Sequence, residues 1–129
     1  MMRTYLPITL ALVSGIGIGA AAVQSLQAQS RPPVYYVSEN ELTNSDGYMK
    51  EYAPRQSELI KQSGGRYLVG ESKTTTFEGP PPASRIVITV WDSLDKIQAW
   101  RASPAYKELR AIGDRHAKFR AYAVEGISQ

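Results

Sequence analysis

The stretch QSGGRYLVGES (residues 62–72) places two glycines between a helical pattern and an apolar strand pattern. Glycine readily adopts the left-handed conformation that ends helices. A phosphate-binding loop has the opposite order, in which a strand precedes the glycines and a helix follows them. The stretch therefore predicts the end of a helix at Gly64 and Gly65, followed by a strand over residues 66–77 with a bulge or bend at Gly70.

A strand and a helix are expected before these glycines. The segment VYYVSENEL (residues 34–42) is rich in aromatic and β-branched residues, which favour strands. Asp46 is a suitable N-cap for a helix that begins at Gly47. Pro54 lacks a backbone donor, so we expect a kink, or two short helices that meet, near Ala53. The buried face of this helix carries, at helical spacing, Tyr48, Tyr52, Leu59 and Ile60.

Two further strands and two short helices are expected after the glycines. The segment RIVITVW (85–91) is continuously apolar, as in a central strand, and FRAYAVEGI (119–127) is the last strand. Asp92 resembles the cap of a helix that runs through Trp100. A serine followed by Pro104 then predicts the start of a second helix.

The expected order of elements is therefore β, α, β, β, one or two helices, and β. This is the split β-α-β pattern (βαββαβ) of ferredoxin-like α+β folds, in which a four-stranded antiparallel sheet carries its helices on one face. The other face would be open, and a small domain seldom leaves an apolar face wet. We therefore expect a homodimer that packs sheet against sheet.

Composition excludes several classes of function. The chain has 129 residues, a length typical of one domain. Its formal charge of +3 is too small for electrostatic binding of nucleic acid. It has no cysteine and one histidine, so a disulfide framework, a thiolate nucleophile and a zinc site are not expected. We expect no metal and no cofactor.

The N-terminal segment MMRTYLPITLALVSGIGIGAAAVQSLQAQS (residues 1–30) predicts export. One positive charge precedes an apolar run over 6–23, and small and polar residues follow up to Ala28. This is the layout of a secretory signal peptide that is cut after Ala28. The run also approaches the length of about 20 residues that spans a membrane as an apolar helix, so an uncleaved anchor is the alternative.

Both alternatives place the domain outside the cytoplasm. A cut signal gives a periplasmic or secreted protein, and an uncut one gives a domain anchored to the inner membrane. The expected layout is a signal peptide or anchor over 1–28, a linker over 29–33 and a ferredoxin-like domain over 34–127. Contact with a membrane is expected only through residues 1–28.

The motifs of the mature chain resemble those of a known family. The segments GYMKEYAP, GGRYLV, FEGPPPASRIVI, WDSLDKIQAWRASPAYKELR and VEG, with their spacing, are similar to those of the domain of unknown function 1330 family, in the dimeric α+β-barrel superfamily. The resemblance covers about residues 34–127. It implies a ferredoxin-like protomer and a dimer, and it carries no established reaction. The superfamily also includes cofactor-free oxygenases, isomerases and haem proteins.

Three charged residues near the ends of two neighbouring strands form the first candidate site. Arg66, Glu78 and Arg85 match the motifs of the family. Guanidinium groups bind planar anions with two parallel donors, so these arginines would clamp a carboxylate or an enolate. The alternative is an ordinary cross-strand ion pair between Glu78 and either arginine.

The tyrosines form the second candidate site. Tyr36, Tyr52 and Tyr106, together with Trp91, would line a pocket for an aromatic or lipid-like ligand, with a tyrosine donating to a carbonyl group. The alternative is that these residues pack in the core and in a dimer interface.

His116 is the single histidine of the chain and the candidate general base. A haem ligand would be a further role for it, although that also requires an apolar cavity of porphyrin size. The alternative is a cation near the C-terminal end of a helix, where positive charge is favourable.

These residues lead to one preferred function and one alternative. The preferred function is an exported homodimer that binds a small, partly apolar molecule and acts on it, if at all, as a cofactor-independent enzyme of oxygenase or isomerase type. In such an enzyme Arg66 would be the anion clamp, Tyr52 or Tyr36 the proton donor and His116 the base. The alternative is a non-catalytic dimeric binding or interaction module of the cell envelope. Convergence of Arg66, the tyrosines and His116 on one cavity would favour the enzyme.

Overall fold

Four antiparallel strands form one sheet in the order β2-β3-β1-β4. The computed structural model describes residues 31–70 and 73–128. Within them, residues 33–127 form a compact unit. The strands are β1 (Val34–Leu42), β2 (Arg66–Val69), β3 (Arg85–Trp91) and β4 (Ala117–Glu125). This is the strand order of the expected ferredoxin-like fold.

The predicted signal peptide or anchor and residues 29–30 of the predicted linker lie outside the described residues. Among the residues that the structure does describe, no helix is long and apolar enough to cross a membrane.

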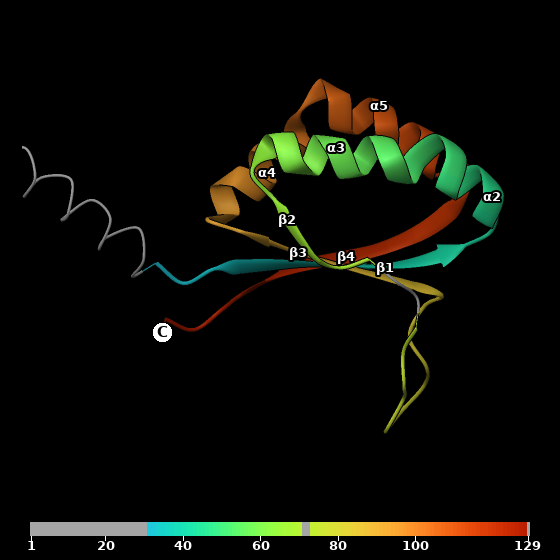
Figure 1. Ribbon diagram of the computed structural model, residues 1–129, viewed down its shortest axis with the longest axis horizontal. Helices are drawn as coiled ribbons and strands as arrows, with labels where there is room; N and C mark the ends of the chain where they lie inside the picture. The colour runs from blue at the N-terminus through green and yellow to red at the C-terminus, as the bar shows by residue number, and fades with distance from the viewer. Residues whose placement is uncertain (1–30, 71–72, 129) are drawn as a thin grey trace, which may run out of the picture. The chain divides into compact units, whose positions relative to one another are not determined.

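All helices of the described residues lie on one face of the sheet (Figure 1). The first helical segment consists of α2 (Ser45–Gly47), the π-helical turn η2 (Tyr48–Tyr52) and α3 (Ala53–Ser63). The second consists of α4 (Leu94–Ala102) and α5 (Pro104–Gly113). The opposite face of the sheet carries no helix from the described residues.

The start of the first helical segment differs from the prediction. Asn44, and not Asp46, caps α2, because its side-chain oxygen accepts from the amide of Gly47 at 3.1 Å. The amides of Thr43 and Asn44 both donate to the carbonyl of His116, at 2.8 and 3.0 Å, which holds Asn44 extended ahead of the helix. The cap is thus selected by a contact between distant parts of the chain.

Two helical elements of different type meet at Ala53, in agreement with one of the two expectations for this position. The π-helical turn η2 ends at Tyr52, and α3 begins at Ala53 with Pro54 in its first turn. Proline is tolerated there because the first amides of a helix have no intrahelical acceptor.

The two glycines after α3 end the helix, as predicted. Gly64 has φ of +107°, and its amide donates to carbonyls of the last helical turn. A side chain at Gly65 would begin 2.6 Å from both Ile60 and Trp91. One glycine therefore supplies the left-handed turn and the other permits close packing.

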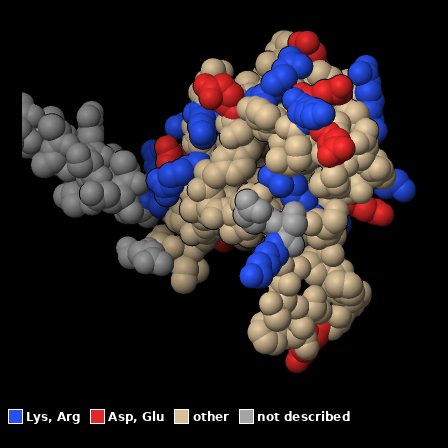
Figure 2. All heavy atoms as spheres, turned by 45° about the vertical axis from the view of Figure 1, so that its right-hand side comes forward, with Lys and Arg blue, Asp and Glu red and all other residues tan. Residues whose placement is uncertain are grey.

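The prediction of a strand over 66–77 is wrong in its length, because β2 ends at Val69. A bulge separates Tyr67 from Val69, which pairs with Ile88. Because β3 begins only at Arg85, it has too few residues to pair with a strand that extends to residue 77. Residues 73–84, here called the arm, project beyond the face of the sheet that has no helices (Figure 1). The arm shows mostly uncharged surface (Figure 2), and Phe77 within it is 92% exposed.

The later elements follow the prediction with small shifts. Strand β3 has the predicted bounds, whereas β4 begins two residues earlier and ends two residues earlier than predicted. Ser93, and not Asp92, caps α4 by accepting from the amide of Lys96 at 3.3 Å. Asp92 instead forms an ion pair with the Lys96 side chain at 3.1 Å. Ser103 caps α5 as predicted.

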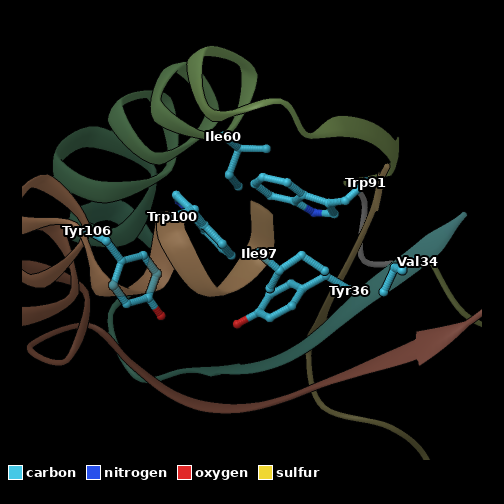
Figure 3. Close-up of a cluster of buried hydrophobic side chains, with 7 residues drawn as sticks. All are labelled: Val34, Tyr36, Ile60, Trp91, Ile97, Trp100 and Tyr106. Carbon is cyan, nitrogen blue, oxygen red and sulfur yellow. The ribbon is translucent and has the colours of Figure 1, made fainter. Parts of the chain in front are cut away.

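The core lies between the sheet and the helices. Its largest cluster joins two tryptophans, two tyrosines and aliphatic residues from β1, α3, β3, α4 and α5 (Figure 3). Trp100 lies at its centre, since ring centroids of three other aromatic residues are within 5.1 Å of its own. The cluster consists of Val34, Tyr36, Ile60, Trp91, Ile97, Trp100 and Tyr106.

Candidate ligand-binding cavity

A cavity of about 230 Å³ lies between the helix-covered face of the sheet and the helices. Elements from both halves of the chain contribute to it. Its polar wall includes Asn40, Gln56, Arg85 and Arg110. Its aromatic wall consists of Tyr36, Tyr48, Tyr52, Tyr67, Trp100, Tyr106 and Phe119.

One hydrogen-bonded chain ends at the hydroxyl of Tyr48. The hydroxyl of Ser38 donates to Asn40 at 2.5 Å, and the amide nitrogen of Asn40 donates to the Tyr48 oxygen at 2.9 Å. Ser38 and Asn40 are buried on the helix-covered side of β1. The Tyr48 oxygen is thus an acceptor within this chain, which leaves its own proton available to a further group.

A second chain ends at the hydroxyl of Tyr52. The indole nitrogen of Trp100 donates to Gln56 at 3.3 Å, and the amide nitrogen of Gln56 donates to the Tyr52 oxygen at 3.0 Å. The rings of Tyr48 and Tyr52 are 5.1 Å apart. Two neighbouring phenols of the cavity are therefore oriented in the same way, each accepting from a buried amide.

Two more phenols accept from arginines. Arg101 donates to the oxygen of Tyr36, and Arg110 donates to the oxygen of Tyr106 at 3.4 Å. Figure 3 shows the hydroxyls of Tyr36 and Tyr106 facing one another. Arg110 is itself paired with Asp114 at 2.8 Å, so its charge is compensated.

Burial raises the pKa of four phenols of the cavity above the usual value, which is already well above neutral pH. Loss of solvation, with a smaller contribution from the neighbouring Tyr106, raises the pKa of Tyr36 to about 12 against the opposing effect of Arg101. Burial is also the largest cause that raises the pKa of Tyr48, Tyr52 and Tyr67 above the usual value of 10. Protonated phenols donate hydrogen bonds, so the cavity presents donors and no phenolate base.

Arg85 is the cavity's uncompensated cation. It is partly buried at the start of β3, and among the described residues no carboxylate pairs with it. Its Nε is buried without a hydrogen-bond acceptor. The guanidinium carbon lies 5.5 Å from the centroid of the Tyr48 ring.

The sequence profile of the domain of unknown function family DUF1330 matches residues 33–127. The chain belongs to the DUF1330 family. The match confirms the resemblance seen in the sequence. No protein with a curated description matches the chain significantly.

Solved structures share the fold of this DUF1330 domain at low sequence identity. A protein of unknown function from Rhodopseudomonas palustris, RPA0582, superposes with a TM-score of 0.64 at 12% identity, over 85% of this chain and 94% of its own. The cofactor-independent oxygenase SnoaB from Streptomyces nogalater gives 0.55 at 14% identity, over 76% and 96%. The hypothetical Arabidopsis thaliana protein At3g17210 gives 0.54 at 13% identity, over 78% and 92%. Identities this low show a common fold.

Four of the eight candidate site residues named in the sequence analysis line the cavity of the DUF1330 domain. They are Tyr36, Tyr52, Arg85 and Tyr106. Trp91 does not line it; its side chain packs in the core cluster with Trp100 and donates to Thr89 at 2.8 Å.

The remaining three candidates, Arg66, Glu78 and His116, do not line the cavity either. Arg66 is exposed on β2, and Glu78 is exposed in the arm. Neither forms a cross-strand ion pair in the described part of the chain, where Arg85 also remains without a carboxylate. The structure therefore does not bring Arg66 and Glu78 to Arg85.

His116 is buried outside the cavity lining. Its Nε2 lies 2.7 Å from a carboxylate oxygen of Glu51, and its ring packs against the backbone at Gly47. The expected convergence of Arg66, the tyrosines and His116 on one cavity is absent. Within the described residues, no group of three His, Cys, Asp or Glu side chains could hold a metal ion.

Sequence reasoning missed the polar residues that orient the phenols, Asn40 and Gln56. The sequence does indicate the position of Asn40. It is an even number of residues away from Val34 and Tyr36, so its side chain lies on the same, buried side of β1. Gln56 follows Tyr52 by four residues, which places both on one helical face. A polar residue at a position that the pattern predicts to be buried is a sign of a hydrogen-bonded site.

Proposed function

We propose that the DUF1330 domain binds one small, partly apolar molecule in the cavity between its sheet and its helices. The observation that carries this proposal is the aromatic wall with oriented phenols. Small-molecule sites combine apolar walls with a few placed polar groups, as here. No metal and no cofactor is part of the proposal.

The size of the cavity limits the ligand. An engineered cavity of about 150 Å³ binds benzene, and sites for drug-sized ligands measure about 300 to 1,000 Å³. The cavity here, at about 230 Å³, lies between them. It therefore fits a molecule with one ring or an equally short chain.

Binding accounts for the geometry better than catalysis. No aspartate, glutamate or histidine is among the described residues that line the cavity, and burial raises the pKa of its phenols Tyr36 and Tyr48 further from neutral pH. A cofactor-independent oxygenase or isomerase would need a group that removes a proton from its substrate. Such an enzyme is the second candidate, favoured by Tyr52 and Tyr36 as donors to a developing enolate oxygen.

The proposal includes a homodimer that covers the open face of the sheet. Tyr35, Val37, Ile86 and Ile88 alternate with buried residues and so face away from the helices. Tyr122 and Val124 of β4 join them and are 43% and 52% exposed. A second copy of this face is the self-complementary partner that a two-fold interface requires.

An exported location also belongs to the proposal, and it is supported by the sequence of residues 1–28 alone. Export with cleavage predicts a chain that begins at Gln29 in the cell envelope, and an anchor predicts the full chain in the membrane fraction. The mass of the protein purified from each fraction distinguishes the two.

The test of the main proposal is native mass spectrometry with a cavity-filling variant. We expect the wild-type protein to retain a bound small molecule, and Val87→Phe, which adds a ring to the cavity wall, to lose it. Leu68→Phe is the matched control, because Leu68 is 50% exposed and does not line the cavity. Circular dichroism checks that both variants fold. Equal retention by both variants would place the ligand elsewhere and contradict the proposal.

A further inference from the structure

The cavity holds one positive charge that nothing in the described structure compensates. Arg110 pairs with Asp114, whereas Arg85 has no ion pair and lines a cavity whose described residues include no acid. Among the described side chains, two nitrogen atoms are buried without any partner, and the Nε of Arg85 is one of them. The other, Nδ1 of His116, belongs to a residue outside the cavity lining.

An unsatisfied buried donor is costly. Leaving one unpaired costs roughly 1 to 3 kcal/mol, and more for a charged group. A protein retains such a group where an acceptor from outside the chain completes it. Arg85 and its unpaired Nε therefore indicate a ligand with a negatively charged oxygen.

A second donor lies beside Arg85. The chain from Ser38 through Asn40 makes the Tyr48 oxygen an acceptor and leaves the Tyr48 proton free. Asn40 is the register partner of Arg85, so this chain reaches the same end of the sheet. A guanidinium N–H and a phenol O–H are thus available together, next to an aromatic wall.

We propose that the ligand is a small aromatic or unsaturated monocarboxylate, whose carboxylate accepts hydrogen bonds from Arg85 and Tyr48 and whose apolar part lies against Tyr52 and Trp100. This inference rests on the proposed binding function and names its ligand class. One uncompensated arginine matches one negative charge. A phosphate group carries more charge and is typically bound by several cations or by a glycine-rich loop before a helix.

The experiment compares acids with their uncharged amides. Isothermal titration calorimetry with benzoate, cinnamate, benzamide and cinnamamide at neutral pH measures each affinity for the full protein. We expect at least one acid to bind about tenfold or more tightly than its amide. Arg85→Gln should weaken binding of that acid by roughly tenfold to a hundredfold, the range for hydrogen bonds to charged groups, with less than about a threefold change for the amide.

Two further variants control the comparison. Arg66→Gln removes the same charge from an exposed arginine outside the cavity lining, so it should leave the affinity for the acid unchanged. Tyr48→Phe removes the second donor and should weaken binding of the acid by roughly threefold to tenfold. If Arg85→Gln does not fold, Arg85→Lys is measured instead. Lysine keeps the charge but lacks the planar pair of donors, so it should weaken binding of the acid, by less than the loss expected for Arg85→Gln.

The outcomes separate the two proposals. The carboxylate inference would be overturned if the amides bind as tightly as the acids, or if the Arg85 and Arg66 variants lose equal affinity for the acid. Either result would leave the proposal of small-molecule binding intact. If neither acids nor amides bind and the native protein also retains no small molecule, both proposals fail.

Discussion

The two faces of strand β1 differ in a way that simple alternation does not predict. On the helix-covered face, Ser38 and Asn40 are 9% and 2% exposed, although both are polar. On the opposite face, Tyr35 and Val37 are only half-buried, although both are largely apolar. The open face also carries Glu39, which pairs with Arg120, and the exposed Glu41, so both faces hold polar groups and only the covered face buries them fully.

This difference in the burial of polar groups indicates different uses for the two faces. Buried polar groups are retained where hydrogen bonds satisfy them, and those of the covered face orient the phenols of a cavity. Apolar groups on an uncovered sheet face mark a surface for association. The covered face is thus the candidate ligand site, and the open face is the proposed dimer interface.

The largest expected effect comes from truncating the core of the covered face. Trp91→Ala should lower the free energy of unfolding by about 3 to 5 kcal/mol, because it empties the space of a side chain that is 1% exposed. Urea denaturation followed by circular dichroism measures the loss. Tyr122→Ala on the open face, measured below the concentration at which the protein associates, should cost less than about 1 kcal/mol. Similar losses for both variants would remove the difference between the faces.

The second prediction concerns the open face. Val37→Asp should raise the dissociation constant of the dimer by roughly a hundredfold or more, because it buries an unpaired carboxylate at the centre of the interface. Sedimentation equilibrium over a range of concentrations measures it. Ala105→Asp makes the same kind of change at an exposed position on α5 and should leave association unchanged. A wild-type protein that stays monomeric at high concentration would contradict the dimer itself.

The smallest expected effect sharpens the description of the cavity. The pKa of Tyr36 is near its usual value of 10 in the unfolded chain and about 12 in the folded chain. Between these values the folded state binds more protons, so stability is fully present below pH 10 and falls as pH rises to 12. The contribution of Tyr36 is roughly 2 to 3 kcal/mol over this interval.

Urea denaturation between pH 9 and pH 12 measures this dependence. Tyr36→Phe should reduce the slope of stability against pH, because it removes one of the buried phenols. The other phenols with raised pKa values, among them Tyr48 and Tyr67, preserve part of the slope. An unchanged slope in the variant would show that Tyr36 is solvated in the folded protein.

Local signals predicted most elements of the fold correctly. The apolar run over 85–91 and the cap at Ser103 agree with the structure because each depends on neighbouring residues. The cap at Asn44 and the short strand β2 were not predicted, since they depend on distant contacts. The carbonyl of His116 fixes the cap, and the start of β3 limits the strand.

The candidate site was predicted only in part. Tyr36, Tyr52, Arg85 and Tyr106 line the cavity, whereas Arg66, Glu78, Trp91 and His116 lie outside its lining. The type of a residue shows which side chains could bind a ligand or transfer a proton, but it does not show where in the fold they lie. For Arg66 and Arg85, both at strand ends, the direction of each side chain depended on strand register and on the bulge in β2.

The sequence by itself determined the order of strands and helices, because periodicity and glycines act over a few residues, and its motifs identified the family. The tertiary structure decided which groups meet. Two chains of hydrogen bonds, from Ser38 to Tyr48 and from Trp100 to Tyr52, join residues from β1, η2, α3 and α4. Such contacts form only when the helices pack onto the sheet, because burial then makes each unpaired polar group costly.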